Sequence, residues 1–160
     1  MTATTPTTAS NSIEEQVLLP TSRERVWRAL TNAEEFGAWF GANLKGATIA
    51  PGAHVVGQIT IPNYEHVTFD IIVEEMVPER RFAWRWHPHA VEKGVDYSAE
   101  PRTLVTFTLE DAAGGGTLVR VVESGFRGLP EWRRDSAFRG NSGGWRGQLT
   151  GNLPAYLTRS

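Results

Sequence analysis

The stretch RGNSGGWRGQLTGNLPAYL, residues 139–157, decides the fold. Its composition argues against a helix, whereas its apolar spacing is that of a helix. By propensity it is a poor helix, since an interior glycine costs about 1 kcal/mol and a proline about 3 kcal/mol relative to alanine. Yet Trp145, Leu149, Leu153 and Tyr156 recur at helical spacing. On a helical wheel the glycines and Pro154 gather on the opposite face, which a random loop would not produce. We therefore predict one long C-terminal helix, in which Pro154 is the place for a kink.

This predicted helix has three kinds of side chain around its axis. Phe138 joins the apolar face, and the glycines form a bare outer face. Asn141, Gln148 and Asn152 lie along one edge of the apolar stripe. These amides form either the polar mouth of a pocket or a solvated helix edge, and the sequence favours neither.

The rest of the chain changes from helical spacing to alternation. Residues 13–19 alternate, and Thr21 with Glu24 and Asn32 with Glu35 have the spacing of capping boxes, so two short helices follow the first strand. Period-two segments bounded by turn residues then predict five more strands, at residues 55–61, 67–77, 81–87, 103–110 and 117–126. Short turns between neighbouring strands imply antiparallel pairing. The expected class is α+β, a curved antiparallel sheet of six strands with helices on one side.

Composition limits the possible functions. The chain has 160 residues, net charge −2, a pI near 6.1 and no cysteine. This excludes disulfides and thiolate zinc sites and gives no general attraction to nucleic acid or anionic membranes. No apolar run reaches the roughly 20 residues of a membrane-spanning helix, and no signal peptide is visible. We expect a disordered segment at residues 1–11, one domain at residues 12–160, and a cytoplasmic location.

Several short segments resemble the SRPBCC (START-like) helix-grip domains. The matching segments are Ser12-Ile13, Val26-Trp27 with Leu30-Thr31, Trp39-Phe40, Arg81 to Trp86, Leu104 to Phe107, Gly116 to Val119, Glu123 to Phe126, and Asn141 to Leu149 with its Gly144-Trp145 pair. The resemblance covers residues 12–158. Within the superfamily, the chain resembles more narrowly the branch named after the C-terminal domain of the activator of heat-shock protein 90 ATPase. It implies a helix-grip fold, in which the sheet curls round the long helix and leaves a cavity between them. The superfamily includes lipid carriers, hormone receptors and polyketide cyclases, so function does not follow from the fold.

Within that fold, one carboxylate is expected beside an aromatic cavity. Trp84 and Trp86 share a strand face that should point inward, and on the last strand Glu123 shares a face with Val119 and Val121, since burying Arg120 instead would be costly. Glu123 either orients a ligand hydroxyl, acts as a general base, or is a structural acid paired near a strand end. The aromatic residues either line a pocket or fill the core.

Other chemistry-bearing patterns are weak. His87-Pro88-His89 lacks a carboxylate pair that would complete a metal site, so we expect surface histidines at a strand end and no metal. Arg133-Arg134 lies beside Asp135 and fits solvated charge better than a phosphate site. No phosphate-binding glycine loop or nucleophile elbow is present, and no motif predicts a cofactor.

The leading hypothesis is binding of a small hydrophobic or aromatic molecule between the sheet and the C-terminal helix. One alternative is a cyclase- or hydrolase-type enzyme with Glu123 as general base. Another is a protein-interaction module, either an activator of a chaperone ATPase or a homodimer that uses the glycine face. The predicted ligand-binding residues are Trp84, Trp86, Phe107, Glu123, Asn141, Trp145, Gln148, Leu149 and Tyr156.

Overall fold

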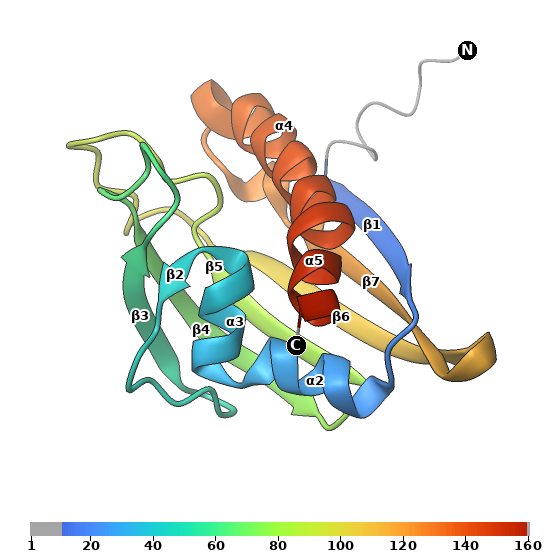
Figure 1. Cartoon of the computed structure of the whole chain (residues 1–160). Coiled ribbons are helices and arrows are strands. Elements are labelled where there is room, and N and C mark those ends of the chain that lie inside the picture. The colour runs from blue at the N-terminus through green and yellow to red at the C-terminus, as the bar shows by residue number, and fades with distance from the viewer. Residues whose placement is uncertain (1–10, 160) are drawn as a thin grey trace, which may run out of the picture.

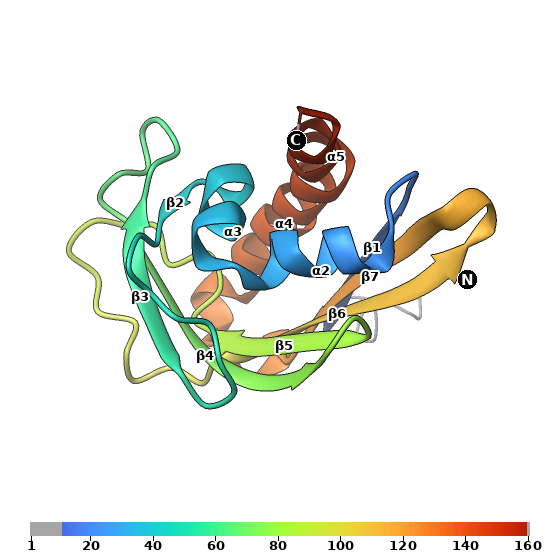
Figure 2. The ribbon, with the colours of Figure 1, turned by 60° about the horizontal axis from the view of Figure 1, so that its bottom comes forward.

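The computed structural model describes residues 11–159 and confirms the α+β helix-grip fold. A curled antiparallel sheet holds the helices on its concave side, and the long C-terminal helix crosses the sheet diagonally (Figures 1 and 2). Residues 1–10 of the segment expected to be disordered lie outside the described residues. Asn11 is described, and its carbonyl oxygen accepts a hydrogen bond from the backbone N–H of Gly125 at 3.1 Å.

The sheet order is β1-β7-β6-β5-β4-β3-β2. Six strands match the predicted ones, and the seventh is a two-residue strand that the sequence analysis missed because it is too short to alternate. The strands are β1 (Ser12–Leu19), β2 (Ala42–Asn43), β3 (His54–Ile59), β4 (Thr68–Val77), β5 (Arg81–Trp86), β6 (Thr103–Ala112) and β7 (Gly116–Ser124). The β6–β7 turn falls where the glycine run predicted it, because Gly114 and Gly115 both adopt positive φ angles (71° and 80°) that other residues rarely adopt.

Two short helices follow β1, as predicted, although the first cap differs by one residue. Helix α2 (Arg23–Thr31) is capped by Ser22, whose hydroxyl accepts from the N–H of Arg25 at 3.2 Å, and not by Thr21. Helix α3 (Ala33–Phe40) begins at the predicted cap, where the Asn32 side chain accepts from the N–H of Glu35 at 3.0 Å. It ends at Gly41, whose φ of 103° is left-handed and stops the helix.

The C-terminal helix is continuous in space but has three parts. These are α4 (Glu131–Gly147), a π-helical turn η3 (Gln148–Asn152) and α5 (Leu153–Arg159); short 3-10 turns η1 (Ala113–Gly115) and η2 (Phe126–Gly128) occur earlier. In the π turn the N–H of Leu153 donates to the carbonyl of Gln148, five residues back. Because Pro154 has no N–H to donate to Thr150, the irregularity falls in the turn before the proline.

The predicted inner faces are confirmed. Val119, Val121 and Glu123 are fully buried, and Trp145, Leu149 and Leu153 bury the apolar face of the C-terminal helix. Most helix glycines are exposed: a Cβ at Gly143, Gly144, Gly147 or Gly151 would meet nothing within 4 Å. The sheet and the helices therefore share one core, which fills only part of the concave side.

Candidate functional site

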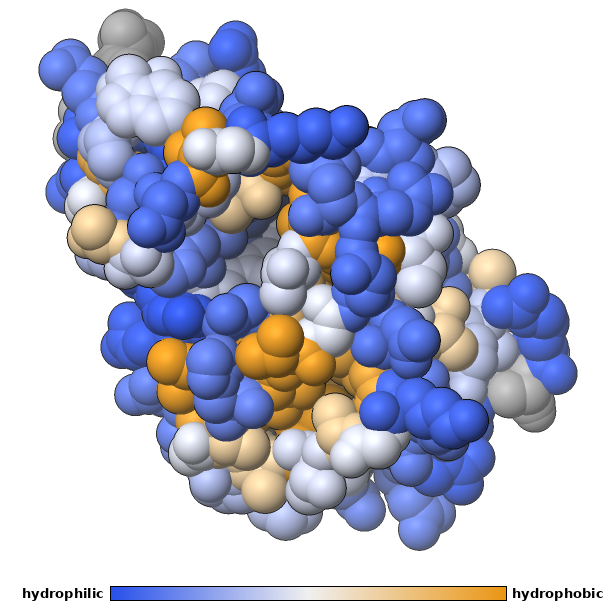
Figure 3. Space-filling view, turned by 90° about the vertical axis from the view of Figure 1, so that its left-hand side faces the viewer, coloured by the Kyte–Doolittle hydropathy of each residue, from blue (hydrophilic) through white to orange (hydrophobic). Residues whose placement is uncertain are grey.

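A cavity of about 650 Å³ opens at the end of the sheet formed by β3, β4 and β5. Phe40 from the end of α3, Phe69 from β4 and Trp86 from β5 form an aromatic group on its wall. The ring centroids of Phe69 and Phe40 lie 6.2 Å and 6.1 Å from that of Trp86. Figure 3 looks onto this side of the molecule and shows a hollow with both hydrophilic and hydrophobic side chains around it.

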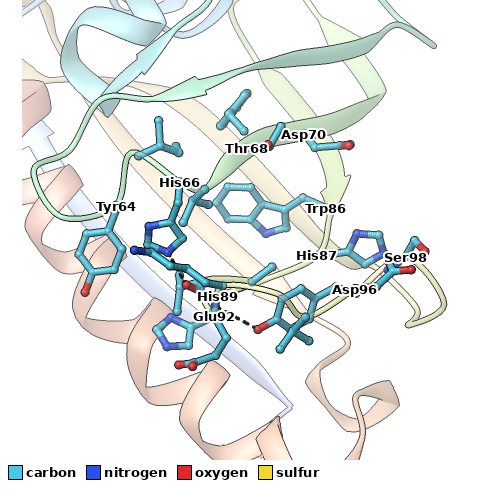
Figure 4. Close-up of a pocket in the computed structure, with 18 of the residues that line it drawn as sticks. Tyr64, His66, Thr68, Asp70, Trp86, His87, His89, Glu92, Asp96 and Ser98 are labelled. Carbon is cyan, nitrogen blue, oxygen red and sulfur yellow. Dashed lines mark hydrogen bonds between the residues drawn. The ribbon is translucent and has the colours of Figure 1, made fainter.

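Two loops, residues 60–67 and 87–102, complete the wall of the cavity. The His66 ring joins them, since its Nε2 lies 2.7 Å from the carbonyl oxygen of Val91, and the Tyr64 ring stacks beside the His66 ring (Figure 4). Both polar and aliphatic side chains of these loops line the cavity. The polar residues of the lining are Tyr64, His66, Thr68, Asp70, His87, His89, Glu92, Lys93, Asp96, Tyr97, Ser98, Arg102 and Asn141.

The second loop is tied to the C-terminal helix by Arg133. This side chain is 3% exposed, donates to Glu100 Oε1 and to the carbonyl of Pro88 at 2.7 Å and 2.8 Å, and stacks over the ring of Tyr97. The interpretation of Arg133 as solvated charge is therefore wrong. A buried cation keeps its place only when it is paired, so Arg133 holds the shape of the loop and with it one wall of the cavity.

Two histidines of the cavity wall have pKa values below the ordinary value of histidine. Burial, reinforced by Arg102, lowers the pKa of His87 below its ordinary value, and burial together with Arg133 lowers the pKa of His89. The expectation of surface histidines is thus corrected for both residues, which are partly buried. Within residues 11–159 no group of three His, Asp or Glu side chains has the geometry of a metal site.

A smaller cavity of about 110 Å³ adjoins the main one at the C-terminal helix. Phe40, Trp86 and Asn141 line both cavities, and Gly144, Trp145 and Gln148 complete the smaller one. The Gln148 amide is held at both ends, because its Nε2 donates to the carbonyl of Phe40 at 2.9 Å and its Oε1 accepts from Asn152 at 2.8 Å. The predicted amide edge of the helix is therefore partly cavity wall and partly an anchor to α3.

Behind these cavities, the buried Glu123 side chain accepts four hydrogen bonds. Its Oε2 accepts from Trp86 Nε1 at 2.8 Å and from the Thr103 hydroxyl at 2.6 Å. Its Oε1 accepts from Asn141 Nδ2 at 2.9 Å and from Trp145 Nε1 at 2.8 Å. A carboxylate can accept about four such bonds, so an ionised Glu123 is fully satisfied without a cationic partner.

This arrangement fixes cavity residues from two elements at once. Trp86 comes from β5, Asn141 and Trp145 come from α4, and all three line the smaller cavity. Glu123 itself is fully buried and is absent from the lining of both cavities. Its lone pairs are already occupied, so the geometry favours a positioning residue and gives no support to a general base that reaches substrate.

Apart from Glu123, the predicted site residues separate into three groups. Trp86, Asn141, Trp145 and Gln148 line the cavities. Trp84, Phe107 and Leu149 are fully buried in the core and line neither cavity. Tyr156 lies at α2 and α3, and its hydroxyl donates to Glu35 Oε1 at 2.9 Å. Burial alone would raise the pKa of Glu35, but hydrogen bonds from Tyr156 and Arg25 outweigh burial, so the pKa of Glu35 is lowered.

Sequence reasoning missed the two loops that form much of the main cavity. Their residues show no period and no motif, and turn residues such as Pro88 and Gly94 mark only the places where strands end. The one local signal was the presence of three histidines and two tyrosines in these two loops, between residues 64 and 97.

The chain belongs to the family described as activator of Hsp90 ATPase homolog 1-like protein, whose model matches residues 20–158. This agrees with the SRPBCC branch that the sequence resembles. Among proteins with curated functions, no sequence matches the chain significantly.

Solved structures show the same fold. Protein MLL2253 from Mesorhizobium loti is 23% identical with a TM-score of 0.70, covering 93% of this chain and 98% of its own. The Aha1 dimer from Colwellia psychrerythraea is 18% identical with a TM-score of 0.66, covering 91% and 95%. DynU16, from the dynemicin biosynthetic locus, is 26% identical with a TM-score of 0.68, covering 92% of this chain and 47% of its own.

In the part of the chain that the structure describes, no helix has the length and hydrophobicity to cross a membrane.

Proposed function

We propose that this protein binds a small, mainly apolar or aromatic molecule in the main cavity. The observation that carries the proposal is a hollow of about 650 Å³ walled by Phe40, Phe69 and Trp86 and surrounded by polar side chains. Binding sites for small molecules are typically clefts of about 300–1,000 Å³ with apolar walls and a few placed polar groups. The likeness to a protein from a biosynthetic locus also fits a small-molecule role.

The hydrogen bonds behind the cavity support binding further. Trp86 is half-buried and offers an aromatic face to a ligand, while its N–H is held by Glu123. A wall held in place in the free protein loses little conformational entropy when a ligand binds. The proposed role is therefore that of a carrier or a sensor, in which Glu123 shapes the site and performs no proton transfer.

Filling the main cavity tests this proposal. Ala90 lines it, whereas Ala155 is exposed on α5 and lies outside both cavities. With 2-naphthol as the probe and titration calorimetry as the measurement, we expect Ala90→Phe to weaken binding at least about tenfold, since a ring then occupies the ligand's space. Ala155→Phe is the matched control and should bind like wild type. Equal affinities for the two variants, or a wild type that binds no aromatic probe, would contradict the proposal.

The protein-interaction alternatives stay predictions. The outward glycines leave a smooth helix face, and one structural neighbour is an Aha1 dimer, so sedimentation of the purified chain tests a homodimer directly. A chaperone ATPase assay without stimulation would rule out the activator hypothesis. The cytoplasmic location also stays a prediction.

A further inference from the structure

Asn141 lines the smaller cavity, and its hydrogen bond to Glu123 fixes the orientation of its side-chain amide. Glu123 accepts hydrogen bonds from Trp86, Trp145 and Thr103, and Asn141 directs its Nδ2 toward Glu123 Oε1 as the fourth donor. The carbonyl oxygen of the Asn141 amide then points away from Glu123. Among the described residues none donates a hydrogen bond to this oxygen, and Asn141 lines both cavities. The cavity therefore presents an acceptor at this point.

The space beside this acceptor depends on a missing side chain. Gly144 lies one helical turn after Asn141 and lines the smaller cavity, and a Cβ added to it would meet nothing within 4 Å. Both ends of the Gln148 amide are occupied, so that residue closes the cavity without offering a comparable group. The remaining wall consists of the Phe40, Trp86 and Trp145 rings, which suit a flat apolar group.

We propose that the smaller cavity is a subsite for a flat aromatic arm of the ligand that carries a hydroxyl or N–H group, which donates to Asn141 Oδ1. This inference rests on the proposed ligand-binding function and narrows the ligand class to hydroxylated or amino-bearing aromatic molecules. Asn141 recognises the donor, Gly144 provides room for the arm, and Glu123 prevents the Asn141 amide from turning its N–H₂ group to the ligand.

The first test compares 2-naphthol with naphthalene on wild type and Asn141→Leu. A net hydrogen bond changes affinity by up to about tenfold. We expect Asn141→Leu to weaken 2-naphthol binding by about that factor and to leave naphthalene binding within about twofold. Comparing each compound with itself on two proteins cancels the different hydration of the two compounds. A thermal melt checks that the variant is folded.

The outcomes separate the two proposals. An equal loss for both compounds, or no loss for either, would overturn the subsite while leaving ligand binding in the main cavity intact. If wild type binds neither compound, the proposed function fails and the subsite fails with it.

The second test does not depend on Asn141. Gly144→Leu is compared with Gly147→Leu on the same helix, because a Cβ at either position meets nothing within 4 Å but only Gly144 lines the cavity. The two substitutions change the helix in the same way, and we expect only Gly144→Leu to weaken 2-naphthol binding, by about tenfold or more. Equal affinities for the two leucine variants would overturn the subsite.

Discussion

Trp84 and Trp86 lie two residues apart on the same face of β5, yet they belong to different regions of the molecule. Trp84 is fully buried, and its ring centroid lies 5.4–5.7 Å from those of Phe82, Phe107 and Phe36. Trp86 is only half-buried and lines both cavities. Tryptophan is thus part of the packed core at position 84 and part of the cavity wall at position 86.

The difference arises from where α3 ends. Phe36 packs over Trp84, but Gly41 stops the helix one residue after Phe40, so the sheet beyond that point is covered mainly by loops. The two indole N–H groups differ as well. Trp86 donates to Glu123, whereas Nε1 of Trp84 has no hydrogen-bond partner in the described part of the chain. Helix coverage therefore separates a filled region from a hollow one along a single strand.

The largest expected effect comes from removing the core member of the pair. Trp84→Ala should lower the free energy of unfolding by about 3–5 kcal/mol, because a large ring is lost from a packed core. Trp86→Ala should cost clearly less stability but should abolish binding of an aromatic probe. Urea unfolding followed by circular dichroism measures the first effect, and titration with 2-naphthol measures the second. Similar losses of stability for the two variants would contradict the distinction between the two regions.

A variant of Glu123 tests how much its four hydrogen bonds stabilise the structure behind the cavities. In Glu123→Gln the amide N–H₂ group faces either Trp86 or Trp145, and neither indole can accept a hydrogen bond. One buried indole N–H is then unsatisfied, which should cost about 1–3 kcal/mol in the free energy of unfolding. Chemical denaturation gives this value, and tryptophan fluorescence reports the altered indole environment. An unchanged free energy of unfolding together with unchanged fluorescence would show that the four hydrogen bonds contribute little.

The smallest expected effect is a pH dependence of local stability in the loop of residues 87–102. His87 and His89 have pKa values lowered mainly by burial, so near pH 6.5 and below the unfolded chain binds more protons at these residues than the folded one. Their contribution to stability is therefore present above about pH 6.5, decreases as the pH falls, and levels off below the lowered pKa values. We expect faster hydrogen exchange in residues 87–100 at pH 5 than at pH 7, after correction for the intrinsic rate.

The matched control replaces both histidines. His87→Gln with His89→Gln should flatten this dependence on pH, while exchange in β6 and β7 should stay the same in both proteins. Acceleration of the same size in the double variant would assign the effect to other groups.

Most of the fold could be predicted from the sequence because it depends on local periodicity. Alternation located six strands within about three residues, and capping signals located α2 and α3. The apolar and glycine-rich faces of residues 139–157 predicted a helix, although the glycines alone argue against one. The helix forms because burial of Trp145, Leu149 and Leu153 offsets the propensity cost of the glycines. The sequence marked Pro154 as a place of irregularity but did not reveal its form, a π turn at Gln148–Asn152.

The site could be predicted only in part. Trp86, Asn141, Trp145 and Gln148 stood out because they lie on regular elements whose inner faces follow from periodicity. Arg133 was misjudged, because nothing local indicates that a charged residue will be buried against a distant loop. The partners of Glu123 come from β5, β6 and α4, and such long-range pairings leave no trace in spacing.

The sequence by itself determined which faces of each strand and helix are apolar, because side-chain direction follows from backbone period. Only the tertiary structure decided which part of that apolar surface is filled and which part stays open. Filling depends on where α3 stops and on how the loop of residues 87–102 is anchored by Arg133, and both depend on contacts between residues far apart in the chain.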